Sequence, residues 1–384
     1  MNSILYIGCD IPDGNAAAIR VFSNAKALYE YGYKVYILSF DHSTLPKSNN
    51  LIDGIEVIHK HHPNSSTEYL RHLVDYKTYA NLIDELMVNN KLDAVIAYEL
   101  PGISFFRLKQ YCKRKKISLI CDCAEWHTAI HLHGIAKIVK MLDVCISMRF
   151  SYKKADGIIV ISNYLKDYYY KRFSGSLIQV PPLQYKKSSR HEFFTRSPRR
   201  FIYAGVAGKD KDCLDAILEA FSLLTDRSFV LDLYGLTEDD CVSVWPKTLD
   251  YITSIRSHAE VYFHGRQPHN VIINKTIASD FSILVRNATR KNNAGFPTKF
   301  GESIECGTPV IATEFSDVVQ YINDYNLGLV VSDKDNLHLS LKAAIDMPDQ
   351  QLLLMKIRCY NSLLFNYSSY ITILGEFIHS MTKK

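Results

Sequence analysis

The chain has 384 residues, of which 47% are hydrophobic and 22% charged, and its formal net charge is +5. That length exceeds one ordinary core, so we expect two domains, and the small charge by itself gives no reason to expect nucleic acid as a partner. The sequence contains no run of about 18 apolar residues, so no membrane span is predicted. The first residues lack the pattern of a signal peptide. The nine cysteines show no disulfide-like framework, which favours a reducing cytoplasm, and no CxxC pair, which argues against a zinc site.

The first half of the chain alternates short apolar runs with helical patterns. A helix is expected over 18–32 and should stop at Gly32, because glycine readily adopts the left-handed conformation that ends helices. Alternation of this kind predicts a parallel, doubly wound sheet. The expected strands are 4–9, 34–40, 93–98, 118–123 and 157–162.

Segment 180–200 interrupts this alternation with a pair of prolines and then a polar, basic stretch, which is typical of an interdomain linker. Strands are expected again at 200–205, 229–235, 260–265, 280–285, 308–313 and 327–332, and helices over 335–381. We therefore predict an N-terminal Rossmann-like domain over 1–183, a C-terminal one over 184–365, and a last helix over 366–384 that packs back on the first domain. Two such domains would face a cleft bordered by the carboxyl ends of their strands.

The loop after the first strand, "DIPDGNAAAIR" (10–20), places Gly14 and Asn15 before small residues that open a helix. Backbone N–H groups at a helix N-terminus suit an anion, so both residues are candidate ligand contacts. An ordinary strand–helix turn is the alternative. Arg20, one turn into the helix, would face the cleft or solvent. No GxGxxG motif occurs here, which weakens the case for an NAD-dependent dehydrogenase.

The loop after the strand 200–205 combines Gly205 with Lys209 and Lys211. A phosphate-bearing ligand fits a glycine-flexed loop with lysines. A solvated, charged loop is the alternative, and the GK[ST] ending of a Walker A motif is missing.

Arg286 follows the strand 280–285, and a helix over 298–306 would put Lys299 and Glu302 on one face. A lysine near a helix N-terminus opposes the helix dipole, and an anionic ligand would resolve that conflict. An exposed Lys299–Glu302 ion pair, contributing about 0.5 kcal/mol, is the alternative. We predict that Lys211, Arg286 and Lys299 hold a diphosphate. Glu302, an acceptor when ionised, would bind ribose hydroxyls of the same nucleotide sugar.

At these residues the chain resembles the glycosyltransferases of family 4, which have the two-Rossmann GT-B fold. "AGVAGKDKD" (204–212) keeps the glycine and Lys211 of that family's loop, with Val206 where the family has an arginine. "ECGTPV" (305–310) matches the family's turn, and Glu302 matches the second of its two glutamates, while Ala294 stands at the first.

The variant "GFPTKFGES" (295–303) is similar to a subgroup with Pro-x-Lys-x-x-Glu that is common in bacterial surface-polysaccharide synthesis. The loss of the first glutamate leaves open how the donor sugar ring is held. The resemblance implies ring contacts from the backbone around Gly295, Phe296, Pro297 and Thr298.

In the N-terminal half, "DCAEWHTA" (122–129) ends a strand where the family often has a polar or histidine residue against the transferred sugar. Asp122, Glu125 and His127 are the candidates. Trp126 would be a wall for a sugar ring or part of the core. His131 and His133 follow, but loop histidines are more often merely solvated.

The resemblance implies a retaining, hexosyltransferase-like and metal-independent enzyme without a cofactor. Its donor would be a UDP or GDP type of sugar, and its acceptor a glycan or polyprenyl-linked glycan of capsule, O-antigen or exopolysaccharide. Lys211, Arg286 and Lys299 would stabilise the leaving diphosphate, and His127 or Glu125 would orient sugar and acceptor. The two aspartates, Asp239 and Asp240, would lie in a solvated loop and would not form a metal site.

Basic clusters at 109–116 and 148–156 could rest on an anionic membrane, or be solvated helix ends. We therefore expect a cytoplasmic protein with peripheral contact at the inner face of the plasma membrane. Two other functions remain open: a nucleotide-sugar epimerase of the same shape, and a non-catalytic subunit of an assembly complex.

Overall fold

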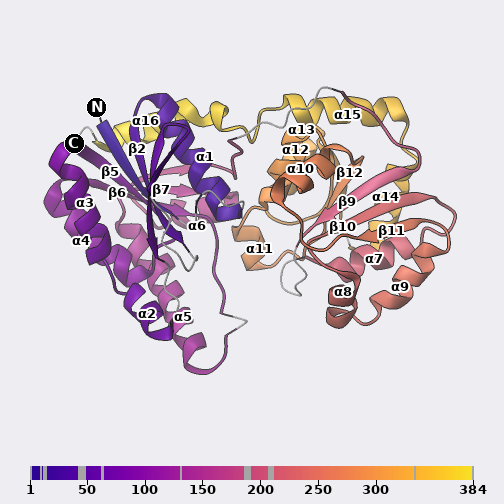
Figure 1. Ribbon diagram of the computed structural model, residues 1–384, viewed down its shortest axis with the longest axis horizontal. Helices are drawn as coiled ribbons and strands as arrows, with labels where there is room; N and C mark the ends of the chain where they lie inside the picture. Colours follow the sequence, from indigo (N-terminus) through magenta and orange to yellow (C-terminus); the bar gives the residue numbers. More distant parts are fainter. Residues whose placement is uncertain are drawn as a thin grey trace. The chain divides into compact units, whose positions relative to one another are not determined.

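The computed structural model (Figure 1) describes residues 2–8, 11, 15–41, 49–61, 65–129, 132–185, 192–205, 212–332 and 334–382. The chain forms two compact units. The N-terminal unit comprises Met1–Tyr185, Ala294–Phe296 and Asn366–Lys384, and the C-terminal unit comprises Lys186–Asn293 and Pro297–Phe365. The predicted limits were 183 and 365, and the short return of 294–296 to the first unit was not foreseen.

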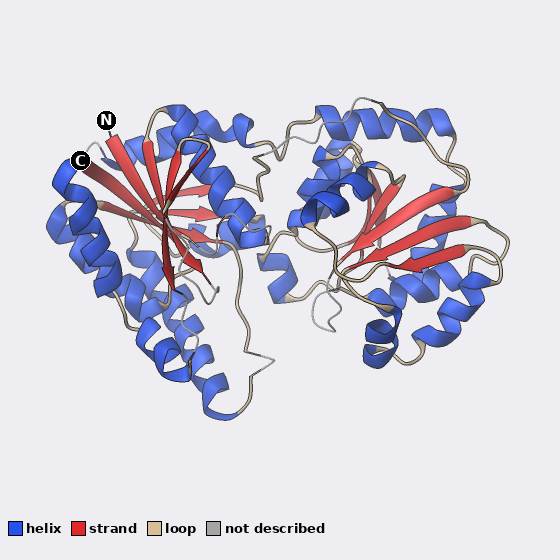
Figure 2. Ribbon diagram, in the orientation of Figure 1, coloured by secondary structure: helices blue, strands red, loops and turns tan. Residues whose placement is uncertain are grey.

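The N-terminal unit is built on an eight-stranded sheet of order β3-β4-β2-β1-β5-β6-β7-β8. Neighbouring strands are parallel except for the antiparallel pair β3 and β4. Helices cover both faces (Figure 2), which explains why the central strands are apolar on both sides. The strands are β1 (Asn2–Ile7), β2 (Lys34–Asp41), β3 (Asn50–Ile52), β4 (Ile55–His61), β5 (Lys91–Tyr98), β6 (Ser118–Cys123), β7 (Gly157–Val160) and β8 (Ser176–Gln179).

The helices of this unit include α1 (Ala16–Tyr31), which ends at Gly32 with φ of 113°, confirming the predicted stop. The last helix, α16 (Ile371–Thr382), packs on α1 and contributes Leu374, Phe377 and Ile378 to the core of the unit. The others are α2 (Ser66–His72), α3 (Lys77–Asn89), α4 (Gly102–Lys115), α5 (Gly134–Ile146) and α6 (Asn163–Tyr170).

A fully buried ion pair joins α1 to β6. Arg20 and Asp122 are 1% and 0% exposed, and Arg20 Nη2 lies 2.6 Å from Asp122 Oδ1. Tyr6 donates to Asp122 Oδ2 at 2.6 Å, and Arg20 Nη1 donates to the Val180 carbonyl at 2.9 Å. The expectation that Arg20 faces cleft or solvent is therefore wrong, because this carboxylate draws it into the core. Asp122 likewise lies inside the unit, with both oxygens bonded, and not at its surface.

The C-terminal unit is built on a six-stranded sheet of order β11-β10-β9-β12-β13-β14, parallel throughout. Its strands are β9 (Arg199–Ala204), β10 (Phe229–Tyr234), β11 (Glu260–Phe263), β12 (Phe281–Leu284), β13 (Val310–Thr313) and β14 (Gly328–Val331). Its helices are α7 (Leu214–Ser222), α8 (Glu238–Val244), α9 (Thr248–Arg256), α10 (His269–Ile277), α11 (Arg290–Ala294), α12 (Thr298–Glu305), α13 (Val318–Tyr325), α14 (Leu337–Ile345) and α15 (Asp349–Asn361).

Every predicted strand is present, and the predicted helix at 298–306 is α12. Strands β3, β4 and β8 were not predicted. The pair Asp239 and Asp240, expected in a loop, lies in the first turn of α8, because Thr237 and Asp240 form a capping box that starts the helix there. In the described part of the chain, no helix has the length and apolar character needed to cross a bilayer.

Candidate functional site

The first candidate site lies at the carboxyl ends of β9 and β12 in the C-terminal unit, where one carboxylate binds two cations. Arg286 Nε lies 2.6 Å from Asp212 Oδ1, and Lys299 Nζ lies 3.3 Å from Asp212 Oδ2. The Tyr203 hydroxyl donates to Asp212 Oδ2 at 2.9 Å. The side chains of Asp212, Arg286 and Lys299 are 6%, 11% and 33% exposed. Two positive charges therefore share one buried negative charge, and the cluster keeps a net positive charge.

Burial and the neighbouring charges shift the pKa values of Asp212 and Lys299. Burial by itself would raise the pKa of Asp212, but the charges of Lys299 and Arg286 and the hydrogen bonds from Arg286 and Tyr203 lower it to about 2. Burial, and secondarily the charge of Arg286, lowers the pKa of Lys299, although Asp212 opposes that effect. Within the described part of the chain, Arg286 forms its side-chain hydrogen bond through Nε, which leaves its terminal nitrogens available to an anion.

Glycine at position 205 lets Lys299 approach the backbone. Gly205 follows β9, and its N–H donates to the Tyr234 carbonyl at 2.9 Å. A Cβ atom there would lie 2.5 Å from Lys299 Nζ and would also collide with the Tyr203 hydroxyl. A side chain at position 205 would therefore require Lys299 and Tyr203 to shift.

Glu302 lies one turn after Lys299 on α12 and is half-buried. Burial raises the pKa of Glu302, while the charges of His269 and Lys299 oppose the rise. The ammonium of Lys299 is paired with Asp212, and the described residues contain no ion pair between Lys299 and Glu302. The alternative of a simple Lys299–Glu302 pair is therefore wrong. The cation that seemed to conflict with the helix dipole has a partner within the protein.

The remaining predicted contacts, Gly295 to Thr298, directly precede or begin α12 in the sequence. Pro297 is its N-cap residue and gives no side-chain cap, and Thr298 is its first residue, so backbone N–H groups point out of the helix end. Phe296 is 7% exposed, and Gly295 is half-buried beside it. Ala294, at the position of the absent glutamate, is fully buried, and its carbonyl accepts from Ser162 Oγ at 2.7 Å.

Two predicted residues, Lys211 and Gly14, lie outside the described residues, as does His131. Asn15 is the N-cap of α1, and its side-chain oxygen accepts from the Ala18 N–H at 2.7 Å. Sequence reasoning missed Asp212. The only available signal was its place beside Lys211, and its partner Arg286 lies 74 residues away.

The second candidate site lies at the carboxyl end of β5 in the N-terminal unit and is centred on Glu99, which sequence reasoning also missed. Glu99 Oε1 accepts from the backbone N–H of Ala124 at 3.1 Å and of Glu125 at 2.6 Å. Glu99 Oε2 lies 2.7 Å from His127 Nε2. Glu99 has φ of 48°, which is uncommon for a residue with a side chain. Its position directly after the strand 93–98 was the signal that could have found it.

His127 is hydrogen-bonded to the Glu99 carboxylate. The charge of Glu99 raises the pKa of His127 despite partial burial. The bond to Glu99 favours the proton on Nε2, which leaves Nδ1 facing Glu125 Oε2 at 3.9 Å. Trp126 packs edge-on against Tyr168, with ring centroids 4.9 Å apart, and so belongs to an aromatic cluster with α6. His133 is exposed at the start of α5.

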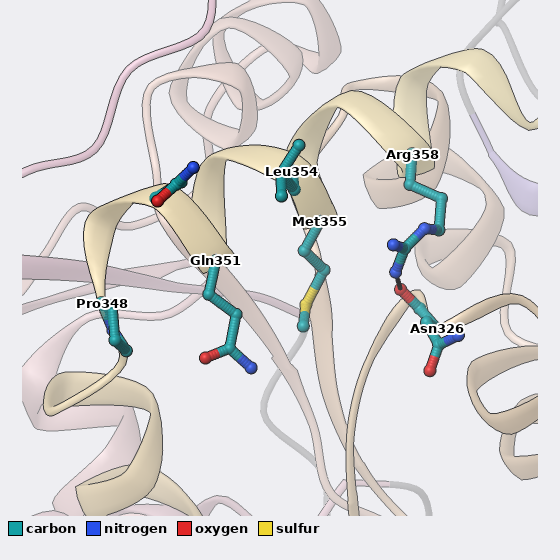
Figure 3. A pocket seen from close by; sticks show the side chains of 7 residues that line it. Asn326, Pro348, Gln351, Leu354, Met355 and Arg358 are labelled. Atoms are coloured by element: carbon teal, nitrogen blue, oxygen red, sulfur yellow. Dashed lines mark hydrogen bonds between the residues drawn. The ribbon is translucent and has the colours of Figure 1, made fainter.

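Described residues of the C-terminal unit line cavities in at least two places. One, of about 550 Å³, borders Asp212 and Asn287 and is lined by α7, Trp245 and the start of α14. The other, of about 460 Å³ (Figure 3), lies along α15, where Arg358 donates to the Asn326 carbonyl at 3.3 Å. Among the described residues, none of the predicted ligand contacts lines this second cavity. No three His, Cys, Asp or Glu side chains of the described residues converge as a metal site would require.

Residues 185–354 match the family model described as "Glycosyl transferases group 1". No curated protein sequence matches the chain significantly. Among solved structures, sucrose-phosphate synthase from Thermosynechococcus elongatus is similar with a TM-score of 0.73 and 14% identity, over 100% of both chains. The catalytic domain of starch synthase IV from Arabidopsis thaliana, bound to ADP and acarbose, gives 0.67 and 12% over 100% of this chain and 99% of that one.

A third similar structure is WaaG, a glycosyltransferase involved in lipopolysaccharide biosynthesis, with a TM-score of 0.62 and 15% identity over 97% of this chain and 99% of that one. At sequence identities this low, the similarity shows a common fold and nothing more. By these comparisons, the C-terminal half of the chain is similar to the glycosyl transferases of group 1, and the chain as a whole has the GT-B fold.

Proposed function

We propose that this protein is a retaining glycosyltransferase that transfers a sugar from a nucleotide-diphosphate sugar to a glycan or lipid-linked acceptor. The observation that carries the proposal is the pair of cations, Arg286 and Lys299, held by Asp212 at the carboxyl ends of β9 and β12. A parallel sheet of this class binds its ligand at that edge. A cluster with excess positive charge at such an edge suits a diphosphate.

In the proposed reaction, the bond between the anomeric carbon and the diphosphate breaks, and the acceptor hydroxyl bonds to that carbon on the same face. The proton of the hydroxyl passes to an oxygen of the departing phosphate. Arg286 and Lys299 stabilise the negative charge that grows on the leaving group. Lys211, outside the described residues, would add a third cation.

Glu302 would accept hydrogen bonds from the ribose of the nucleotide, and the free N–H groups at the start of α12 would meet the donor sugar near Gly295 to Thr298. Burial raises the pKa of Glu302, and the charges of His269 and Lys299 oppose that rise and so favour the ionised carboxylate, the form that can only accept. The donor is proposed to be of the UDP or GDP type.

The N-terminal unit would bind the acceptor. His127, with its Nε2 proton held by Glu99, would present Nδ1 to a sugar or acceptor hydroxyl beside Glu125. No cofactor and no metal ion are included in this proposal, since the cations of the C-terminal unit supply the positive charge.

A bacterial surface polysaccharide, such as capsule, O-antigen or exopolysaccharide, is the proposed product. The Pro-x-Lys-x-x-Glu pattern at 297–302 supports membership of the corresponding subgroup of family 4. The similarity of fold to a lipopolysaccharide glycosyltransferase agrees with it. A lipid-linked acceptor would require contact with the cytoplasmic face of a membrane.

The test is a thermal-shift measurement with UDP, GDP, ADP and CMP on the wild type, Glu302→Ala and Lys299→Ala. We expect one nucleoside diphosphate to raise the melting temperature, and both variants to weaken its binding by about tenfold or more, since a charge-assisted hydrogen bond contributes about 1.5–3 kcal/mol. Leu339→Ala, at an exposed position of α14, is the matched control.

Three outcomes would change the conclusion. No shift with any nucleotide would contradict the donor site. A shift without transfer to any acceptor would favour a non-catalytic subunit, in keeping with Ala294 at the position of the absent glutamate. Turnover of the nucleotide sugar without an acceptor would favour the epimerase.

A further inference from the structure

Helix α5 (Gly134–Ile146) has an unusual orientation for a helix of a globular unit: none of its residues is buried. Its apolar residues recur at helical spacing, and Ile135, Ile138, Met141 and Leu142 are 81%, 59%, 57% and 57% exposed. Contiguous apolar surface of this kind is uncommon on a protein that has no partner for it. We call these four residues the α5 stripe.

The side of α5 that faces the rest of the unit is mixed: Val139 and Ile146 are half-buried there beside Asp143, and Ile146 packs against Gly102. The Asp143 side chain is 10% exposed, and its Oδ1 accepts from the Gly102 N–H at the start of α4 at 2.9 Å. Lys140 is paired with Asp143 at 3.7 Å. This attachment fixes the rotation of the helix, so the α5 stripe is held outward. In Figure 1, α5 lies at the lower edge of the N-terminal unit.

The surroundings of the stripe are basic. Segment 132–154 has five lysines and arginines and one acidic residue, Asp143. Lys137, Arg149 and Lys154 are exposed, and Phe150, in the turn that follows α5, is 62% exposed with Lys153 Nζ over its ring at 5.9 Å. An apolar stripe flanked by lysines is the pattern of a helix that lies in the interface of an anionic membrane.

We infer that the α5 stripe and its basic flank dock this protein on an anionic lipid surface, with Ile138, Met141 and Leu142 entering the headgroup region. The inference deepens the proposed function, since it names the membrane face at which a lipid-linked acceptor would be bound. A second copy of the chain is a poorer occupant, because a symmetric contact would place two basic flanks against each other.

The stripe is close to the proposed acceptor site. Residue His127 precedes α5 by seven positions, and the charge of Lys140 acts on its imidazole by opposing the rise in its pKa. Docking through α5 would therefore bring the Glu99–His127 pair near the lipid headgroups. This assigns the contact to α5 and its following turn, instead of the basic end of α4 at 113–116.

The test uses the full chain and co-sedimentation with vesicles of phosphatidylcholine, alone or mixed with phosphatidylglycerol. We expect the wild type to bind the anionic vesicles and to be released by salt, because screening weakens attraction to the headgroups. The double variant Ile138→Glu/Met141→Glu should lose binding by about tenfold or more. Lys137→Glu should weaken it less. Leu339→Glu, which places the same charge on an exposed apolar site of the C-terminal unit, should bind as the wild type does.

A spectroscopic measurement checks insertion directly. Tryptophan at position 138 (Ile138→Trp) should shift its emission to the blue on addition of anionic vesicles, and Leu339→Trp should not. Absence of wild-type binding, or equal loss in the Leu339→Glu control, would overturn the inference. So would concentration-dependent self-association that only the stripe variant abolishes, which would assign the stripe to a second copy.

The nucleotide thermal shift of the stripe variant separates the two proposals. An unchanged shift with lost vesicle binding supports both of them. If neither the wild type nor the variant shows a thermal shift with any nucleotide, while the wild type binds vesicles as expected, the proposed donor site is contradicted and the inferred membrane surface still stands.

Discussion

The two units use the same group, a carboxylate after a parallel strand, in different ways. In the N-terminal unit, Glu99 accepts two backbone N–H groups and holds a histidine. In the C-terminal unit, Asp212 holds an arginine and a lysine. The first arrangement raises the pKa of an imidazole, and the second brings an arginine and a lysine together on one carboxylate. In the proposed function, the first carboxylate guides an acceptor hydroxyl through His127, and the second positions the cations that meet an anionic leaving group.

A third carboxylate, Asp122, lies in the core of the N-terminal unit and has a structural role. It is fully buried with Arg20, and its removal would leave a buried cation without a partner. We expect Asp122→Ala to cost about 3–5 kcal/mol of the free energy of unfolding, measured by urea denaturation. Asp212→Ala and Glu99→Ala should cost less, because their partners reach solvent. Equal losses for all three would remove the distinction between a core carboxylate and the two site carboxylates.

Replacing Glu99 tests the role of the N-terminal site. In Glu99→Gln the imidazole of His127 loses its negatively charged partner, and turnover should fall about 100-fold while nucleotide binding is unchanged. The pKa of His127, which Glu99 raises, should fall, as NMR titration of the imidazole would report. The ion pair of Glu99 with protonated His127 stabilises the fold below the ordinary pKa of histidine. That contribution is lost as the pH rises through the raised pKa of His127. An unaltered His127 titration would refute the assignment.

Replacing Asp212 tests the C-terminal site and has the smallest expected effect. Its pKa is lowered to about 2 from 3.8, so the ionised carboxylate stabilises the unit by about 2 kcal/mol above pH 4. The contribution is lost as pH falls through the lowered pKa. The unfolding free energies of wild type and Asp212→Asn should therefore converge between about pH 4 and pH 2. A difference that stays constant over this range would exclude the pairing with Arg286 and Lys299.

Much of the fold could be predicted from local patterns. Apolar runs of strand length marked β1, β2, β5 and β6 and all strands of the C-terminal unit, and Gly32 ended α1 as expected. Strands β3 and β8, of 3 and 4 residues, contain no buried residue, so they gave little apolar signal. Residues 239–240 were misassigned, because the cap at Thr237 was overlooked.

Proximity of site residues could be predicted from the sequence only where both residues lie on the same helix or strand. Lys299 and Glu302 share a helix, so their proximity follows from the helical period. The carboxylates that organise both sites were missed, because each acts across the sheet. Asp212 meets Arg286 at a distance of 74 residues, and Glu99 meets His127 at 28.

The sequence by itself determined the local elements, the two α/β units and the strand ends at which ligand contacts belong, since helical and strand periods and turn residues are properties of short segments. Only the tertiary structure decided which charges meet. It buried Arg20 on Asp122, gave Lys299 to Asp212 instead of Glu302, and turned the α5 stripe outward. Strand order and helix rotation make these choices, and both depend on contacts between segments far apart in the chain.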